Sequence, residues 1–170
     1  MRYNVSSLLK APVGARMTIA LDVDHPKMGS DIVVNSIRGK VVLTRTDRRL
    51  LAEGRLDVVV EAECVRCLEL ISQLPIQVDF EELFLLHPVS GNKPSAVYGV
   101  TDEGYLDLTR PLREQIFVSM PTHPLCRSDC RGLCSQCGEN LNLGDCGCSE
   151  DSIDPRLVAL KSLISHDEKK

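Results

Sequence analysis

Eight cysteines arranged as four close pairs constrain this chain more than any other feature. The pairs are Cys64 and Cys67, Cys126 and Cys130, Cys134 and Cys137, and Cys146 and Cys148. A two-residue gap, as in the first and third pairs, lets a tight backbone turn present two thiolates to one tetrahedral Zn²⁺. Gly138 follows the third pair directly and suits the left-handed turn of a zinc knuckle. The spacing therefore predicts structural zinc, as one or two ions, each held by four cysteines.

The sequence leaves the grouping of the ligands open. Our first choice joins the two neighbouring pairs, because the shortest loops close one compact knuckle at the least cost in entropy. The metal ligands in this choice are Cys126, Cys130, Cys134 and Cys137. The remaining cysteines are second-site or alternative ligands, namely Cys64, Cys67, Cys146 and Cys148. The alternative grouping joins the third pair to the fourth and leaves the first pair to meet the second across the fold, which would staple the predicted sheet to the C-terminal segment.

Disulfide bonding, simple burial and redox chemistry compete with zinc binding as roles for the thiols. A disulfide framework belongs to secreted proteins, but the N-terminal run MRYNVSSLLK lacks the charged and apolar regions of a signal peptide. Buried structural cysteine does not suit pairs that lie in polar, glycine-rich sequence. A redox thiol usually needs a helix N-terminus, whereas Cys64 follows a strand pattern. His123, three residues before Cys126, is flanked by prolines and is interpreted as a solvated loop residue and not as a ligand.

The composition suits a soluble protein that is not built to bind nucleic acid by itself. With 170 residues, the chain suits one domain with a small appendage. No run approaches the ~18 apolar residues of a membrane-spanning helix, so we expect a cytoplasmic protein with no membrane partner. The formal charge is −4, and three Phe, three Tyr and no Trp offer few platforms for base stacking. RNA contact would need a local patch.

Alternating hydrophobic and polar residues in the centre of the chain predict an antiparallel sheet of at least three strands. The inward residues of the three clearest strands begin at Ile37, Leu56 and Ile76, and 18–23 predicts a further strand. The strand that begins near Leu56 runs in phase into Cys64, so the first cysteine pair is predicted at a hairpin tip. Pro75 can sit only at a strand start or edge.

Helices are predicted before and after these strands in the sequence. Residues 5–9 favour a short helical turn capped by Asn4 or Ser6, and Thr109 can cap a helix with Pro111 in its first turn. A third helix is predicted to begin at 154–155, and it must dock because about eleven residues are too few for a helix that is stable alone in water. We expect it to pack on the core, with a groove of a partner protein as the alternative. The segment 87–104 lacks periodicity and is interpreted as a surface loop.

The predicted fold class is α+β, because the strands and helices are segregated along the chain. It combines a central antiparallel sheet, open or curled into a partly open barrel, with C-terminal helices and a cysteine-rich zinc-knuckle segment. The predicted domains are a β-rich core with a following helix (1–120), a zinc-binding segment (121–150) and a C-terminal helix (151–170). Phosphate-binding loops, His-Glu-x-x-His and Gly-x-Ser-x-Gly are absent from the sequence, so neither an enzyme nor a small-molecule substrate is indicated.

Several segments of the chain form a recognisable combination, namely 4–9 (NVSSLL), 42–46 (VLTRT), 63–68 (ECVRCL), 124–138 (PLCRSDCRGLCSQCG), 140–142 (NLN) and 153–157 (IDPRL). Together they resemble the YceD family of bacterial and plastid proteins, which are implicated in the accumulation of large-subunit ribosomal RNA. The resemblance spans nearly the whole chain. Some members of this family lack much of the cysteine cluster, so the resemblance implies that the metal supports the fold and is not the shared activity.

The resemblance implies a role in the synthesis, processing or stability of the large (23S) ribosomal RNA during ribosome assembly. The expected partners are the large-subunit ribosomal RNA precursor and/or ribosomal or assembly proteins. Because the chain is acidic, we favour a basic protein partner, with the acidic stretches 79–82 and 150–154 as its contact. Two alternatives remain open at this point, a zinc-ribbon interaction module unrelated to ribosomes and a thiol redox sensor.

Overall fold

An open five-stranded sheet organises the molecule, which is described by a computed structural model over residues 1–86, 98–148 and 156. In spatial order its strands are β2 (Arg16–Asp24), β3 (Val34–Arg45), β4 (Arg49–Glu63), β5 (Leu70–Leu85) and β6 (Tyr98–Gly99). The first four are antiparallel neighbours, and β6 joins β5 in parallel. The expected antiparallel sheet is confirmed, but the described strands do not close into a barrel.

One face of the sheet forms the core, as the alternating pattern predicts. Ile37, Val41 and Leu43 of β3 are buried, and so are the inward residues of β4 and β5, including Leu56 and Phe80. Fully burying one such side chain stabilises the fold by roughly 1.5–3 kcal/mol. The opposite face carries mainly charged residues, because successive side chains of a strand point to opposite faces.

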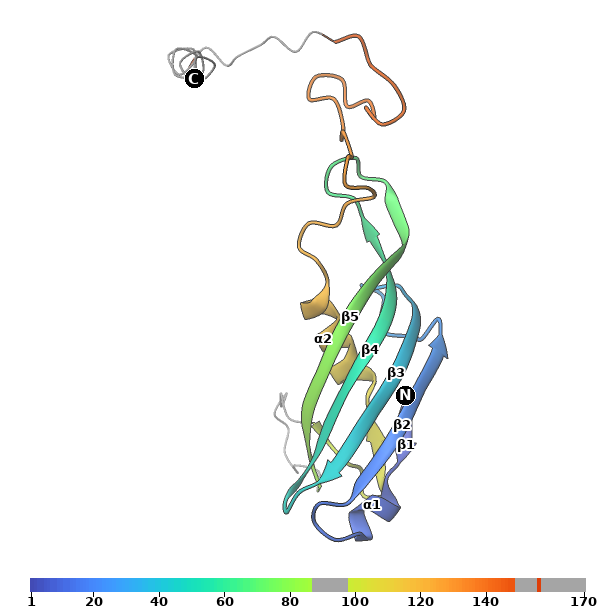
Figure 1. Cartoon of the computed structure of the whole chain (residues 1–170), viewed down its shortest axis with the longest axis vertical. Helices are drawn as coiled ribbons and strands as arrows, with labels where there is room; N and C mark the ends of the chain where they lie inside the picture. Colours follow the sequence, from blue (N-terminus) through green and yellow to red (C-terminus); the bar gives the residue numbers. More distant parts are fainter. Residues whose placement is uncertain (87–97, 149–155, 157–170) are drawn as a thin grey trace.

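The helix α2 (Thr109–Ser119) covers the apolar face of the sheet (Figure 1). Leu112 and Ile116 are fully buried. The helix predicted from Thr109 and Pro111 is confirmed, and both residues lie in its first turn, but the prediction of Thr109 as the cap is wrong because Leu108 occupies that position. The carboxylate of Asp107 accepts the backbone N–H of Thr109 at 2.9 Å and so satisfies a donor that the first turn leaves free.

Smaller elements close the end of the molecule opposite the cysteines. The strands β1 (Arg2–Asn4) and β7 (Tyr105–Asp107) pair as a second sheet, and α1 (Ser6–Lys10) follows β1. The predicted helical turn is present, but Val5 and neither Asn4 nor Ser6 occupies its N-terminal cap; the side chain of Asn4 accepts the Ser6 N–H at 3.0 Å just before it. The Arg45 guanidinium donates to the carbonyl groups of Leu9 and Ala11 and holds the end of α1 on the sheet.

The β4–β5 hairpin extends beyond the other strands and carries the first cysteine pair at its tip (Figure 1). Its strands have 15 and 16 residues, against nine in β2. A register irregularity between Val60 and Ala62 is followed by one further paired stretch, which ends at Glu63 opposite Leu70. The chain that follows α2 folds against this tip, so the sheet positions one half of the candidate site.

Two predictions about β5 and the segment after it are correct only in part. Pro75 lies inside β5 and not at its start, but it lies at an edge, because in the described residues β6 covers β5 only at Phe84 and Leu85. The predicted loop 87–104 is wrong in part, since Tyr98–Gly99 forms β6 and Val100 bridges Leu106. Two residues are too few to show a period-two pattern, so this strand left no signal in the sequence.

Some predictions fall outside what the structure describes. Residues 87–97 of the predicted loop and the C-terminal helix, of which only Arg156 is described, lie outside the described residues. The domain boundaries at residues 120 and 150 stay predictions. No helix within 1–86 or 98–148 has both the length and the apolar character needed to cross a membrane.

Candidate metal centres

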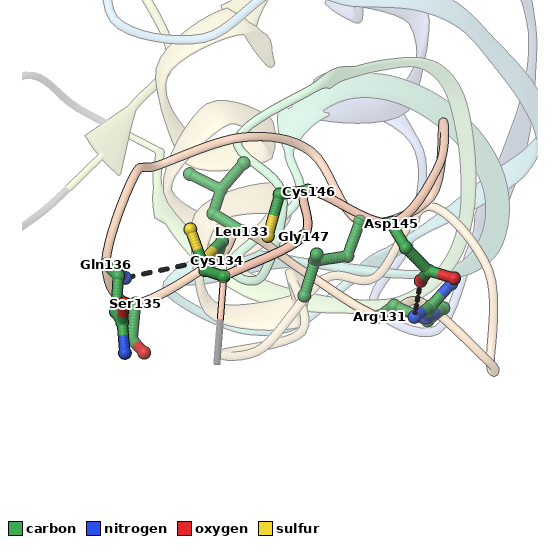
Figure 2. A pocket seen from close by; sticks show the side chains of 10 residues that line it. Arg131, Leu133, Cys134, Ser135, Gln136, Asp145, Cys146 and Gly147 are labelled. Carbon is green, nitrogen blue, oxygen red and sulfur yellow. Dashed lines mark hydrogen bonds and ion pairs between the residues drawn. The ribbon is translucent and has the colours of Figure 1, made fainter. Parts of the chain in front are cut away.

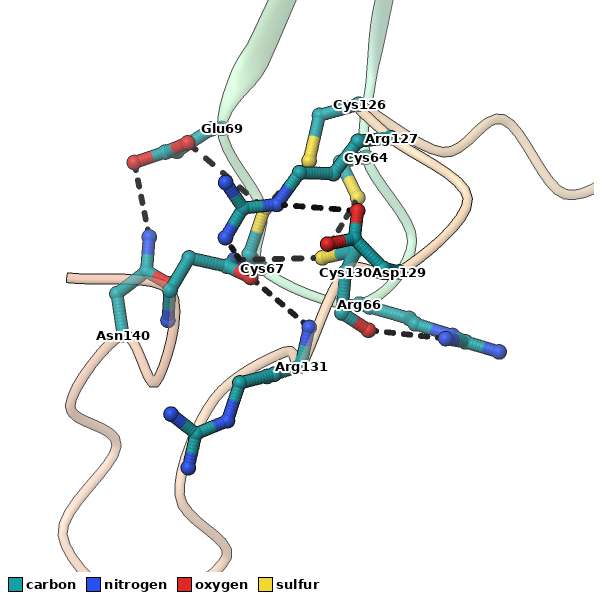
Figure 3. Close-up of polar contacts among 11 residues, drawn as sticks. Cys64, Arg66, Cys67, Glu69, Cys126, Arg127, Asp129, Cys130, Arg131 and Asn140 are labelled. Atoms are coloured by element: carbon teal, nitrogen blue, oxygen red, sulfur yellow. Dashed lines mark hydrogen bonds and ion pairs between the residues drawn. The ribbon is translucent and has the colours of Figure 1, made fainter. Parts of the chain in front are cut away.

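The hairpin tip brings four cysteines from two distant segments together. We call this group the tip site; it consists of Cys64, Cys67, Cys126 and Cys130, whose sulfurs all lie within 4.8 Å of one another (Figure 3). The Sγ atoms of Cys64 and Cys130 are 3.8 Å apart, and those of Cys67 and Cys126 are 3.6 Å apart. Four sulfurs at about 2.3 Å from a tetrahedral Zn²⁺ lie about 3.8 Å apart, whereas a disulfide requires about 2.05 Å. The spacing fits a metal ion and not a disulfide, and all eight cysteines are free.

The other four cysteines form a second group farther along the chain. We call this group the distal site; it consists of Cys134, Cys137, Cys146 and Cys148, again with all sulfurs within 4.8 Å of one another. Figure 2 shows the adjoining pocket of about 460 Å³, which is also lined by an ion pair between Arg131 and Asp145 at 2.5 Å. The backbone N–H of Gln136 donates to the sulfur of Cys134 at 3.4 Å.

The two sites use the same backbone turn. In the tip site the N–H of Leu68 donates to the carbonyl of Cys64 at 2.9 Å, and in the distal site the N–H of Gly138 donates to the carbonyl of Cys134 at 2.9 Å. The residue after the second cysteine is left-handed in both turns, with φ of 60° at Leu68 and 76° at Gly138. The left-handed turn predicted at Gly138 is confirmed.

The structure brings together the alternative grouping of the cysteines and not the first choice. Cys126 and Cys130 approach Cys64 and Cys67, while the third pair approaches the fourth. Our first choice counted only loop entropy. It neglected the hairpin, which delivers one pair as a preformed half-site and removes most of the cost of closing the long loop.

Backbone hydrogen bonds join the two segments of the tip site directly. The N–H of Val65 donates to the carbonyl of Pro124 at 3.0 Å, and the N–H of Leu133 donates to the carbonyl of Arg66 at 3.1 Å. The ring of His123 lies within hydrogen-bonding distance of the Thr122 hydroxyl, 3.0 Å away, and His123 belongs to neither cysteine group.

Polar side chains around the tip site orient its cysteines, and they were not predicted from the sequence. The amide of Asn142 donates to the sulfur of Cys130 at 3.3 Å, and its oxygen accepts the backbone N–H of Arg131 at 2.8 Å. The guanidinium of Arg66 donates to the carbonyl of Cys130 at 2.9 Å. The motif NLN at 140–142 was the available signal, but a polar residue twelve positions from its partner shows no periodic pattern.

The electrostatics of the tip site favour some thiolates and oppose the rest. A hydrogen bond from the backbone N–H of Cys67 lowers the pKa of Cys64 to about 6, and the amide of Asn142 lowers the pKa of Cys130. Burial and the neighbouring sulfurs, that of Cys67 first, raise the pKa of Cys126 to about 12. Each thiolate that forms in the tip site thus makes ionisation of the remaining thiols less favourable.

The distal site follows the same pattern. Backbone N–H groups of Cys137 and Gln136 lower the pKa of Cys134 to about 6. The neighbouring Cys137 sulfur raises the pKa of Cys148 to about 12. A cation among four sulfurs favours the deprotonated form of each one. Both donor sets can therefore hold a metal ion that prefers thiolate ligands.

Comparison with known proteins gives a family for the chain. A protein-family model described as "Large ribosomal RNA subunit accumulation protein YceD" matches residues 52–164. An uncharacterized protein of Mycobacterium leprae is 32% identical over 121 residues, which cover 69% of this chain and 54% of that protein. One from Mycobacterium tuberculosis is 34% identical over 119 residues, with coverage of 68% and 56%. The chain thus spans about half the length of these relatives.

A plant relative carries the family name. It is the chloroplast protein of Arabidopsis thaliana named large ribosomal RNA subunit accumulation protein YCED homolog 1. It is 31% identical over 49 residues, which cover 29% of this chain and 15% of that protein. No solved structure matches the chain.

Proposed function

Because the chain belongs to the YceD family, we propose that it is a non-enzymatic factor for the accumulation of large-subunit ribosomal RNA during ribosome assembly. The observation that carries the proposal is the family match over residues 52–164, which include both cysteine groups. The plant relative's name associates that protein with the same ribosomal RNA. The accumulation role can be exerted through synthesis, processing or protection of the precursor, and none of these requires catalysis by this chain.

We further propose that each cysteine group holds one structural Zn²⁺. Four thiolates fill the tetrahedral positions and leave none open for water, which is the arrangement of structural and not of catalytic zinc. The sulfur separations of 3.6 and 3.8 Å in the tip site support this proposal. Zinc there would fasten the segment after α2 to the β4–β5 hairpin, since each segment supplies two ligands.

The partner that we favour is a basic ribosomal or assembly protein. On the open face of the sheet Glu53 lies opposite Glu81, and Arg55 is paired with Asp79 at 2.7 Å. Like charges opposite each other in a sheet repel, and a basic partner would relieve this repulsion. Within the acidic stretch 79–82, Asp79 and Glu81 are exposed on this face, whereas Phe80 points into the core. The second stretch, 150–154, lies outside the described residues.

Depletion of the protein from cells tests the role. We expect a selective fall in mature large-subunit ribosomal RNA relative to small-subunit ribosomal RNA, with a matching loss of large subunits in sucrose gradients. Re-expression of the wild-type chain should restore the ratio. An unchanged ratio would overturn the proposed role. A pull-down that recovers ribosomal RNA without ribosomal or assembly proteins would overturn the protein partner alone.

A thiol redox sensor is the second candidate, and the lowered pKa of Cys134, about 6, is the observation that favours it. A sensor requires a reactive and accessible thiolate, whereas thiolates bound to zinc are protected. Alkylation of freshly purified protein at neutral pH separates the two. Rapid labelling of Cys134 without a chelator would favour the sensor, and labelling only after chelation would favour structural zinc.

A further inference from the structure

An exposed leucine occupies a left-handed backbone position at the tip of the hairpin. Leu68 has φ of 60° and leaves 57% of its surface exposed. A bulky residue is rare in this conformation because its Cβ crowds the following carbonyl group. The free-energy cost of this conformation is not offset by burial within the described part of the chain.

The distal site shows which residue the same turn accepts without this cost. Gly138 occupies the equivalent position, with φ of 76° and the same hydrogen bond to the first cysteine of its pair. A Cβ built on Gly138 would meet no atom within 4 Å, so the turn leaves open space for a side chain at this position. The preference for glycine there is therefore conformational and not steric. Strain of this kind that is kept at an exposed position points to function.

Two more exposed leucines lie in the two cysteine segments that meet at the tip. Leu70 is 66% exposed at the start of β5, and Leu143 is 83% exposed in the segment that folds onto the tip. Leu143 lines a hollow of about 240 Å³ together with Glu69, the residue between the first two leucines, and with Cys126, Arg127 and Asn142. We call Leu68, Leu70 and Leu143 the leucine patch. The two cysteine segments, 61–71 and 122–148, together supply this patch.

The charges around the leucine patch indicate the class of its partner. The two segments carry three arginines against six carboxylates, which are Glu61, Glu63, Glu69, Asp129, Glu139 and Asp145. All three arginines are engaged internally, since Arg66 donates to the carbonyl of Cys130, Arg127 lies 3.6 Å from Asp129 and Arg131 lies 2.5 Å from Asp145. Each zinc ion with four thiolates would add a further net charge of about −2. This surface would repel an RNA backbone and attract a basic, partly apolar protein segment.

We propose that the leucine patch is the docking surface for a basic protein segment of the large-subunit precursor particle, a segment in which apolar residues alternate with lysine or arginine. This inference rests on the proposed function and names the partner's chemistry. Apolar partner residues cover the leucines, and basic side chains of the partner face the exposed carboxylates of Glu63 and Glu139. A few anchor residues buried at the centre of an interface, and shielded from water by the contacts around them, carry most of its binding energy.

The substitution Leu68→Gly separates docking from folding, because it removes the exposed side chain and relieves the strained backbone at once. We expect the zinc content to stay at the wild-type value and the melting temperature to be equal or higher. We expect affinity for purified, salt-washed large-subunit precursor particles to fall at least tenfold in a co-sedimentation assay. Leu143→Ser should also weaken binding, without touching the turn. Val118→Ala is the matched control, because Val118 is 80% exposed on α2 and lies outside the patch.

Each outcome of this assay supports or overturns the proposal. Wild-type binding by both leucine variants would overturn it. So would binding of the wild-type chain to protein-free ribosomal RNA as tightly as to the particles, or no binding to the particles at all. A normal ribosomal RNA ratio after depletion, together with leucine-dependent binding, would contradict the proposed function and support the docking surface. A lowered ratio of large-subunit to small-subunit ribosomal RNA, together with binding that does not depend on the leucines, would support the proposed function and contradict the docking surface.

Discussion

The side-chain amide of Asn142 donates a hydrogen bond to the sulfur of Cys130, with Nδ2 3.3 Å from Sγ. The same side chain accepts the backbone N–H of Arg131, so Asn142 lowers the pKa of Cys130 and holds the backbone next to it. Mutation of residues that orient metal ligands in this way typically lowers metal affinity by about 10- to 100-fold. The tip site is therefore stabilised by a residue of the segment that follows its last cysteine, Cys130.

We expect Asn142→Ala to lower the zinc affinity of the tip site by about tenfold. Loss of the N–H donor raises the free-energy cost of the Cys130 thiolate and frees the backbone that holds it. Competition with a chromophoric chelator measures the affinity of each site. Ser135→Ala, a change beside the distal site, serves as the control and should leave the tip-site affinity unchanged. Equal affinities in both variants would show that Asn142 has no part in metal binding.

The grouping of the cysteines can be tested with paired serine substitutions. In the structure Cys126 belongs to the tip site and Cys137 to the distal site, so Cys126→Ser with Cys137→Ser should weaken both sites. Cys126→Ser with Cys130→Ser should abolish one site and leave the other intact. The measurement is zinc per chain after dialysis against a weak chelator. Retention of one full equivalent by the first double variant would instead support the sequence-based first choice, in which both residues bind the same ion.

The sheet could be predicted from the sequence because its signal is local. Alternation around Leu56 and Ile76 marks the inward face of β4 and β5, and the phase of β4 places Cys64 at the turn. Thr109 and Pro111 similarly mark the first turn of α2. In each case the residues that determine the element lie within a few positions of one another.

The cysteine grouping could not be decided from the sequence because it depends on contacts between distant segments. Cys64 and Cys130 are 66 residues apart, and their approach depends on the paired β4–β5 hairpin and on α2, which packs on β5 and leads the chain towards the tip. The pairing of Tyr98 with Phe84 likewise depends on the placement of a short segment beside an edge strand. The left-handed conformation of Leu68 also went unpredicted, because leucine has no preference for it.

In metal-free protein, the stability of the folded state and the reactivity of the distal-site thiols should both change with pH. The pKa of Cys134 is about 6, well below the ordinary value of 9.0, so its thiolate stabilises the folded state fully above about pH 9. This contribution is lost as the pH falls from about 9 through 6. We expect the rate of Cys134 alkylation in chelated protein to rise around pH 6, and Cys148, with a pKa of about 12, to react slowly across this range. Peptide mass spectrometry measures both, and a Cys134 profile centred near pH 9 would contradict the prediction.

The contact between β3 and β4 leaves no space for a side chain at Gly54, and this contact supports the hairpin that carries the tip site. A Cβ at this position would lie 2.3 Å from the carbonyl oxygen of Lys40 and 3.1 Å from the Cα of Val41. Both atoms belong to the backbone of β3, which cannot move without breaking the ladder between the strands. We therefore expect Gly54→Ala to lower the free energy of unfolding by about 2 kcal/mol or more, as measured by urea denaturation of the zinc-loaded protein.

The control for this prediction is Gly144→Ala in the cysteine-rich segment. A Cβ at Gly144 would meet no atom within 4 Å, and its φ lies outside the left-handed region. The same chemical change there should alter stability by less than about 0.5 kcal/mol. If the two variants unfold at the same urea concentration, then β3 and β4 are not packed as closely as the structure shows. If only Gly54→Ala loses stability, the close β3–β4 contact stabilises the sheet whose β4–β5 hairpin carries Cys64 and Cys67.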